Sequence, residues 1–209
     1  EKIDGELLSV IAENEKITKY LDMPLQHCDG RILKKMNRPG DERTLDETIG
    51  KIRAAVPNIT LRTTFICGFP GEGKKEFSAL CGFIKRHKFE KLGCFAFSKE
   101  EGTPMEKVKE TVSADEKLRR ADVIMDIQQD ITINNAKTVG RVLKCLVESY
   151  DRHIDRWVAR TQYDAPDIDG RIFFEDKSGN TAPGQFIFLK VTDVLDYDLL
   201  GETANEYSQ

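Results

Sequence analysis

A buried strand that runs directly into a glycine-rich turn is the segment of this sequence best suited to bind a small molecule. Residues 60–67 read as the strand, Gly68-Phe-Pro-Gly-Glu72 reads as the turn, and a helix follows from about residue 74. Because a strand–turn–helix unit directs backbone N–H groups toward one point, it suits an anionic or polar ligand. Glycines also suit a plain tight turn, and the sequence leaves both interpretations open.

The segment from Gly68 to Lys74 also approaches the phosphate-binding loop of nucleotide hydrolases. That motif requires a serine or threonine after its lysine, because the hydroxyl binds Mg²⁺. Here Gly68, Gly73 and Lys74 are in register, but Lys75 follows and has no hydroxyl. Pro70 removes one backbone donor from the loop. The sequence therefore favours a glycine-rich turn over a nucleotide hydrolase.

The overall composition is that of an ordinary soluble globular protein. The chain has 209 residues, of which 39% are hydrophobic and 33% charged, enough for one large or two ordinary domains. With no membrane-length apolar run and no signal-peptide pattern, we expect a cytoplasmic protein without membrane contact. The cysteines show no C-x-x-C spacing, so we expect free thiols and no metal site; they are Cys28, Cys67, Cys81, Cys94 and Cys145.

Strands alternating with helices fill the first two thirds of the chain, and this order predicts parallel β/α units. The expected strands are residues 20–25, 60–67 and 92–97. Because a parallel sheet buried on both faces usually has more strands, we expect a half-barrel truncated at its N-terminus. Capping boxes of Thr44 with Glu47 and of Ser113 with Glu116 predict helix starts, the second opening a bridging helix over residues 113–137.

From residue 138 onward, closely spaced short strands predict a small antiparallel barrel. Residues 138–203 contain 8 Lys and Arg against 12 Asp and Glu, a net charge of −4. This balance disfavours binding to a phosphate backbone and suits a basic protein partner, although a solvated acidic surface is the alternative. We expect most of the aromatic residues here to be core rather than a base-stacking surface: Trp157, Tyr163, Phe173, Phe174, Phe186 and Phe188.

Four segments in combination resemble the methylthiotransferases, a family of radical S-adenosylmethionine enzymes: Tyr20–His27, Arg31–Arg38, Leu61–Glu72 and Phe97–Pro104. The resemblance implies an α/β unit followed by an all-β unit. Residues 1–137 would be the C-terminal half of a partial (β/α)6 radical-SAM barrel, residues 138–203 a five-stranded OB-like barrel called TRAM, and residues 204–209 a tail.

Two further segments, Asp164–Gly170 and Asp196–Glu202, are similar to the branch of the family called RimO. This resemblance implies methylthiolation of the β-carbon of an aspartate in a small-subunit ribosomal protein near the decoding centre. The alternatives are a tRNA-adenosine methylthiotransferase, whose small barrel should be basic, and a non-catalytic protein-binding module. The acidic balance makes tRNA the weaker choice of partner.

The resemblance also defines what this sequence lacks. The family holds one 4Fe–4S cluster with a C-x-x-x-C-x-x-C loop and a second with three cysteines of an N-terminal domain. Neither set occurs here, and such clusters need correctly spaced thiolates. We therefore expect S-adenosylmethionine and two 4Fe–4S clusters in the full-length enzyme, but no cluster, metal ligand or catalytic residue in this chain. Alone it should be inactive, and the missing N-terminal domains would be its partners.

In the family, S-adenosylmethionine lies across the C-terminal ends of the barrel strands. The resemblance therefore implies the following cofactor-binding residues: Gln26, Arg62, Thr64, Gly68, Phe97 and Ser98. Thr63 and Thr64 alternate along one strand, and the sequence does not say which faces the interior. A lone histidine such as His27 reads as a structural residue. The substrate-binding candidates share one turn of the small barrel: Asp164, Asp167 and Asp169.

Overall fold

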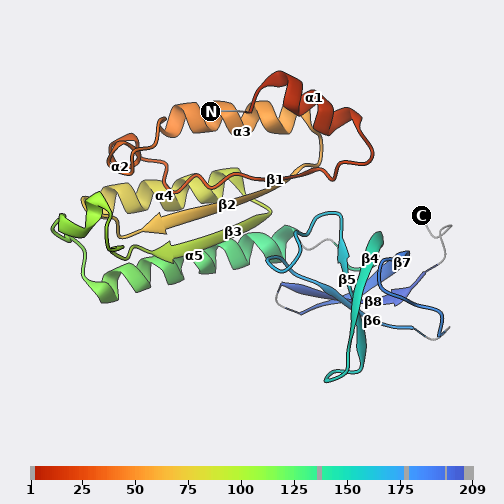
Figure 1. Ribbon diagram of the computed structural model, residues 1–209. Helices are drawn as coiled ribbons and strands as arrows, with labels where there is room; N and C mark the ends of the chain where they lie inside the picture. The colour runs from red at the N-terminus through yellow and green to blue at the C-terminus, as the bar shows by residue number, and fades with distance from the viewer. Residues whose placement is uncertain (1–2, 136–137, 177–178, 196, 205–209) are drawn as a thin grey trace. The chain divides into compact units, whose positions relative to one another are not determined.

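The computed structural model describes residues 3–135, 138–176, 179–195 and 197–204 (Figure 1). Contacts divide the chain into two compact units. The first unit extends to Ile133 but leaves out Thr18–Tyr20. The second unit contains Thr18–Tyr20 and the residues from Asn134 onward. The last two residues of the expected bridging helix and residues 205–209 of the expected tail lie outside the described residues. We keep the boundary at residues 137 and 138 as a proposal.

The first unit alternates helices and strands, as the sequence predicts (Figure 1). Its elements are α1 (Gly5–Glu13), β1 (Tyr20–Asp22), α2 (Gly30–Lys35), α3 (Glu42–Ala55), β2 (Thr60–Cys67), α4 (Lys74–His87), β3 (Lys91–Ala96), the 3₁₀ helix η1 (Pro104–Lys107) and α5 (Ala114–Asn135). The strand order is β1-β2-β3, and β2 and β3 are parallel. The predicted parallel α/β architecture is confirmed.

Both predicted capping boxes differ from those in the structure, although α5 begins next to Ser113 as expected. Helix α3 begins at a capping box of Asp41 with Thr44, in which the Asp41 carboxylate accepts from the Thr44 N–H and the Thr44 hydroxyl accepts from the Asp41 N–H. The expected box of Thr44 with Glu47 is therefore wrong, because a carboxylate three residues earlier already caps the helix. At α5, Ser113 accepts from the Glu116 N–H at 3.4 Å, but the Glu116 carboxylate binds arginines instead of returning to the backbone.

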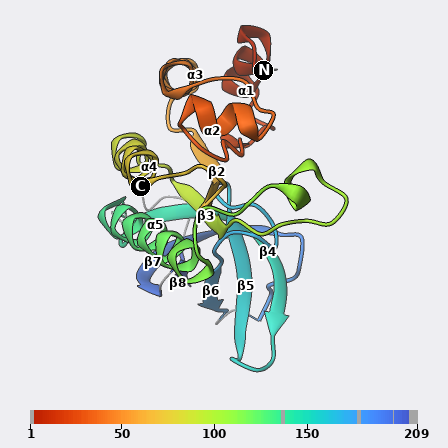
Figure 2. The same cartoon turned by 90° about the vertical axis from the view of Figure 1, so that its left-hand side faces the viewer.

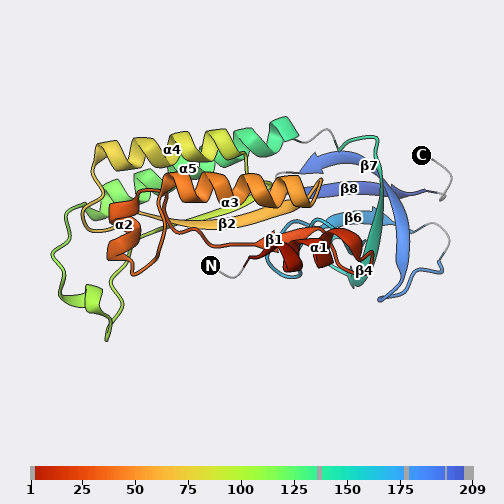
Figure 3. The same cartoon turned by 90° about the horizontal axis from the view of Figure 1, so that it is seen from above.

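Strand β2 separates the unit into a packed face and an open face. Because successive side chains of a strand point to opposite sides, Phe65 and Cys67 are fully buried whereas Thr64 and Ile66 are half-buried. The buried side forms one core with α1, α3, α4 and α5. Figure 3 shows α3, α4 and α5 running along one side of β2. The other side of the strand carries the polar and aromatic side chains considered below.

The alternation also distinguishes the two adjacent threonines of β2. Thr63 is fully buried, and its hydroxyl accepts from the Leu25 N–H at 3.3 Å and donates to the Met23 carbonyl at 3.0 Å. Thr63 therefore ties the chain after β1 to the sheet. Thr64 lies on the open face.

The second unit is a closed five-stranded barrel with the order β4-β5-β6-β8-β7. The strands are β4 (Val142–Asp151), β5 (Arg156–Thr161), β6 (Ile172–Glu175), β7 (Phe186–Leu195) and β8 (Asp198–Thr203). Its expected antiparallel pairing holds for every neighbouring pair except β6 and β8, which are parallel. The reason is topological: five strands closed into a ring cannot alternate in direction at every pair, so one parallel pair must occur.

The aromatic residues of the barrel divide between core and surface. Phe174 is buried, and Trp157 and Tyr163 pack against the same core, while Phe173 and Phe188 are half-buried. Phe186 differs from the expectation because it is 66% exposed, with the Lys144 Nζ 5.1 Å from its ring centre. None of the described helices is both long and apolar enough to span a membrane.

Candidate functional site

A cavity of about 490 Å³ lies on the open face of the sheet, where the strands end. Its wall comes from the segment after β1, the second half of β2, the end of β3 and the loops that follow. The loop after β3, which carries η1, is drawn in light green in Figure 2 and extends to one side of β2 and β3. The volume suits a drug-sized or nucleoside-sized ligand, and the carboxyl ends of parallel strands are where α/β proteins bind ligands.

Four of the six predicted cofactor-binding residues line this cavity: Gln26, Thr64, Phe97 and Ser98. They belong to three separate segments of the chain, and the parallel sheet brings them together. The sequence reasoning missed seven further lining residues: Ile66, Phe69, Phe95, Ala96, Glu100, Thr103 and Met105. Two of them could have been predicted from strand alternation, because residues two positions apart face the same side of a strand. Ile66 lies two positions after Thr64, and Phe95 lies two positions before Phe97.

The other two predicted cofactor residues do not line the cavity. Arg62 pairs with Asp22 of the neighbouring strand at 2.6 Å. Gly68 has a φ of +74°, and a Cβ at this position would lie 2.4 Å from Cγ of Lys117. Gly68 is therefore required by the turn and by close packing against α5, the plain structural role that the sequence left open.

Gln26 is the most unusual residue of the cavity wall. Its φ is +68°, a left-handed value that non-glycine residues rarely adopt. Its N–H donates to the Thr64 carbonyl at 2.8 Å, and its carbonyl accepts from the Ile66 N–H at 2.8 Å. Within the described part of the chain, its Oε1 is buried without a hydrogen-bond partner. An unsatisfied buried carbonyl oxygen costs free energy.

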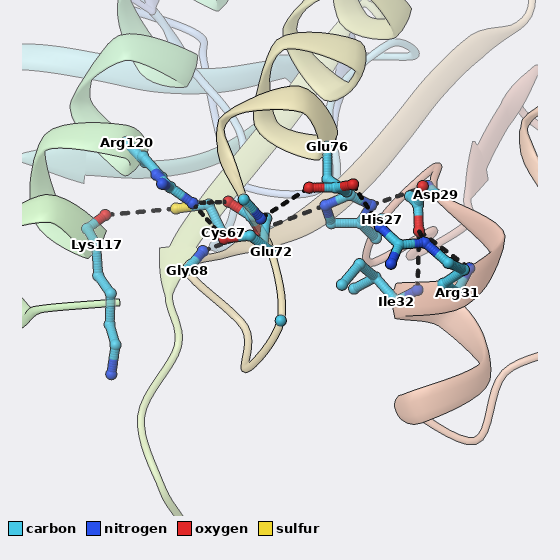
Figure 4. A network of polar contacts seen from close by, with 12 residues as sticks. His27, Asp29, Arg31, Ile32, Cys67, Gly68, Glu72, Glu76, Lys117 and Arg120 are labelled. Atoms are coloured by element: carbon cyan, nitrogen blue, oxygen red, sulfur yellow. Dashed lines mark hydrogen bonds and ion pairs between the residues drawn. The ribbon is translucent and has the colours of Figure 1, made fainter. Parts of the chain in front are cut away.

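A buried polar network surrounds His27, the residue that follows Gln26 in the chain (Figure 4). His27 is fully buried; its Nδ1 accepts from the Asp29 N–H at 2.9 Å, and its Nε2 lies 3.3 Å from Oε2 of Glu72. The Glu72 carboxylate also accepts from the Gly68 N–H at 3.0 Å and from Arg120 Nη1 at 2.7 Å. The network therefore joins the segment after β1, the glycine-rich turn and helix α5.

The network keeps Glu72 ionised although it is buried. Burial alone would raise the pKa of this carboxyl, but the neighbouring His27 ring, Arg120 and the Gly68 N–H outweigh burial and lower the pKa below its ordinary value. For Arg120, burial works to lower the pKa, and the carboxylates of Glu116 and Glu72 more than compensate and raise it. Both groups are therefore charged at neutral pH, as a buried ion pair requires.

The glycine-rich turn is not arranged as a phosphate cradle. Its N–H groups already donate to oxygen atoms of the chain: Gly68 to Glu72, Gly71 to the Thr111 hydroxyl at 2.8 Å, and Gly73 to the Glu76 carboxylate at 2.8 Å. An incoming anion would have to displace two carboxylates. The geometry agrees with the rejection of a nucleotide hydrolase on sequence grounds.

The three aspartates of the small barrel differ in what they contact. Asp164 accepts from the Thr161 hydroxyl at 2.5 Å, and Asp169 accepts from the Ala165 N–H at 2.8 Å. Both carboxylates are half-buried and hold the loop together. Asp167, at a φ of +64°, is exposed. Of the three, Asp167 is therefore the one best placed to meet a partner.

The cysteines do not form a cluster site. Burial raises the pKa of the Cys28 and Cys145 thiols to about 12, so both stay protonated. The Cys67 and Cys94 sulfurs lie 3.8 Å apart on neighbouring strands. Among the residues that the structure describes, no group of three or more His, Cys, Asp or Glu side chains is placed to hold a metal ion. The described residues therefore do not fit an iron–sulfur cluster.

Comparison with known proteins defines the class to which this architecture corresponds. The chain resembles a solved radical-SAM structure, coproporphyrinogen III oxidase (HemN) from Escherichia coli, with a TM-score of 0.50 over 77% of this chain and 42% of that one. At 14% identity this likeness concerns the fold alone. The sequence model of the TRAM domain matches residues 139–204. The chain therefore joins a radical-SAM-like parallel α/β unit to a TRAM barrel.

In sequence, the whole chain is homologous to the ribosomal protein uS12 methylthiotransferases called RimO. The protein of Clostridium acetobutylicum is 42% identical, and that of Acetivibrio thermocellus 40% identical, each over 100% of this chain. In both cases the chain spans 46% of the relative's length. The resemblance predicted from the sequence is confirmed.

Proposed function

We propose that this chain is the C-terminal part of a radical S-adenosylmethionine methylthiotransferase that modifies ribosomal protein uS12. The observation that carries the proposal is the cavity at the strand ends, because it gathers Gln26, Thr64, Phe97 and Ser98 into one wall. Homology to RimO along the whole chain supports the same function. The cytoplasm, where ribosomes are, is its proposed location.

The cavity residues fit S-adenosylmethionine. Gln26 lines the wall, and its side-chain amide could bond to an ammonium or ribose hydroxyl after a small rotation that uncovers its unsatisfied Oε1. Phe69 and Phe97 lie edge to face, 4.9 Å between ring centres, and offer an apolar surface to an adenine ring. The hydroxyls of Thr64 and Ser98 supply further hydrogen-bonding groups. When bound, S-adenosylmethionine would supply the radical and methyl-transfer chemistry of the full-length enzyme.

The remaining parts of the reaction lie outside this chain in our proposal. Two 4Fe–4S clusters would be held by the rest of the full-length protein, which would thus be the first partner of this chain. The chain alone is expected to be inactive. Its own residues bind and orient the nucleoside end of the cofactor.

The TRAM barrel is proposed to meet the basic ribosomal protein. Its net charge of −4 attracts Lys- and Arg-rich surfaces, and exposed Asp167 is the carboxylate best placed for such a contact, with Asp164 and Asp169 shaping the loop. The exposed Phe186 with Lys144 beside it is the specific observation in favour of the second candidate, a tRNA-adenosine methylthiotransferase, because aromatic and basic side chains together suit nucleic acid.

The experiment is to express the full-length gene that encodes this chain in a bacterium lacking its own uS12 methylthiotransferase. Mass spectrometry of uS12 peptides and of tRNA nucleosides is then compared with cells carrying an empty vector. The proposal expects a methylthio group on one aspartate of uS12 and unchanged tRNA. Unmodified uS12 together with methylthiolated tRNA adenosine would instead establish the second candidate.

A further inference from the structure

Gln26 is the centre of a strained three-residue turn at the cavity wall. The N–H of His27 donates to the carbonyl of Leu25 at 2.9 Å, which closes the turn around Gln26. The φ of Gln26 is +68°. A three-residue turn with a positive central φ is the rarer and more strained form, and it persists only where surrounding contacts impose it.

Two sets of contacts impose this turn. The first is the pair of 2.8 Å backbone hydrogen bonds that join Gln26 to Thr64 and Ile66 of β2. The second acts through the next residue, His27, which is fully buried. Since His27 both closes the turn with its N–H and fills the buried site with its ring, a shift of the ring would move Gln26.

The ring of His27 is hydrogen-bonded at one nitrogen and faces a carboxylate with the other. Nδ1 accepts from the Asp29 N–H at 2.9 Å, so the proton of the neutral ring is on Nε2. Nε2 lies 3.3 Å from the Glu72 carboxylate, close enough for electrostatic attraction but without the alignment of a hydrogen bond. Arg120 holds Glu72 in turn, with Nη1 2.7 Å from its carboxylate and 3.0 Å from its carbonyl, while Nε donates to Glu116 at 2.8 Å. Every member of the network is therefore fixed by at least one further contact.

We propose that His27, Glu72 and Arg120 are positioning residues that hold Gln26 in its strained turn and thereby set the affinity of the cavity for an adenosyl ligand. None of the three lines the cavity. The identity of the ligand rests on the proposed function. The control of the Gln26 turn by these three residues does not depend on that function. A merely structural network would stabilise the fold without changing the turn or the affinity.

Two substitutions of His27 separate these possibilities. His27→Asn puts a carbonyl oxygen near the position of Nδ1 and keeps an acceptor for Asp29, but it is too short to reach Glu72. His27→Gln puts an N–H donor near the position of Nε2 and keeps the contact with Glu72. Ile52→Val is the matched control, since Ile52 is fully buried in α3 and takes no part in the network. It lowers stability without touching the turn.

Two measurements are made on the 209-residue chain. Calorimetric titration with S-adenosylmethionine gives the affinity. Hydrogen exchange reports the turn through the amides of Gln26, His27 and Ile66, which donate to Thr64, Leu25 and Gln26 respectively. We expect His27→Asn to bind about tenfold more weakly and to exchange these amides faster, whereas His27→Gln stays within about threefold of the unchanged chain, as does Ile52→Val.

The outcomes distinguish the inference from the proposed function. Unchanged exchange at Gln26, His27 and Ile66 in His27→Asn overturns the inference, whatever the affinity. Faster exchange with unchanged affinity for S-adenosylmethionine overturns the claim that the turn sets binding. If the unchanged chain does not bind S-adenosylmethionine at all, the proposed ligand is wrong, and faster exchange in His27→Asn then still supports the control of the turn.

Discussion

Arg120 in α5 donates to both the carboxylate and the backbone carbonyl of Glu72, at 2.7 Å and 3.0 Å. Both side chains are almost fully buried. The pair fastens the glycine-rich turn, whose Phe69 lines the cavity, to the long helix. Much of the behaviour of the first unit should therefore depend on this one contact.

Replacement of Arg120 by methionine should strongly destabilise the first unit. It leaves the Glu72 carboxylate buried without its main partner, which typically costs about 3–5 kcal/mol. Urea unfolding followed by helical circular dichroism measures the effect, since the described helices belong to this unit. Arg119→Met is the control: Arg119 is an exposed neighbour that pairs with Glu116 on the surface of α5, so little change is expected. Equal effects of the two changes would contradict the account.

Glu72→Gln should alter the pH dependence of stability. The pKa of Glu72 is lower in the folded state than its ordinary value of 4.5, so ionised Glu72 stabilises the fold above that pH. This contribution is lost as pH falls through the lowered folded pKa. The difference in unfolding free energy between the unchanged chain and the variant should thus be largest near neutral pH and shrink in acid.

Urea titrations at a series of pH values test this, with Glu47→Gln as the control. Glu47 forms only a surface pair with Arg43 on α3, and its replacement should matter little at any pH. A stability difference for Glu72→Gln that stays constant from neutral to acid pH would show that the charge of Glu72 is not what stabilises the turn.

Gly68→Ala should destabilise the chain, whereas Gly82→Ala should not. At Gly68 the φ of +74° is unfavourable for alanine, and its Cβ would press on Lys117, so we expect a loss of about 2–4 kcal/mol. Gly82 lies inside α4 with open space around a new Cβ, and alanine there should add about 0.5–1 kcal/mol. Thermal unfolding of both variants measures this. Tolerance of alanine at Gly68 would refute the close packing of the turn.

The aspartates of the barrel should separate into structural and interacting residues. Asp164→Ala removes the acceptor of the Thr161 hydroxyl and N–H and should cost the barrel about 1–3 kcal/mol. Asp167→Asn should leave stability unchanged but weaken salt-sensitive binding to purified uS12. Trp157 fluorescence reports the fold of the barrel. Equal binding by Asp167→Asn and the unchanged chain would remove this residue from the partner surface.

The sequence predicted elements that depend on local pattern. Apolar periodicity and the Gly68 turn indicated the parallel unit, and the spacing of short strands indicated the barrel. The sequence pattern did not predict that β6 and β8 pair in parallel, because this pairing follows from closing five strands into a ring. The roles of Glu72 and Arg120 were also missed, because their partners are distant in the chain. Gln26 was predicted at the site, but a positive φ at glutamine has no signature in a single sequence.

Binding of S-adenosylmethionine in the cavity at the strand ends can be followed residue by residue by NMR, in a titration of the isotopically labelled chain with this ligand. We expect the perturbed backbone signals to concentrate on Gln26, Thr64, Phe97 and Ser98, with residues 164–169 unaffected. An absence of perturbation at saturating ligand, or perturbation centred on the TRAM barrel, would contradict it.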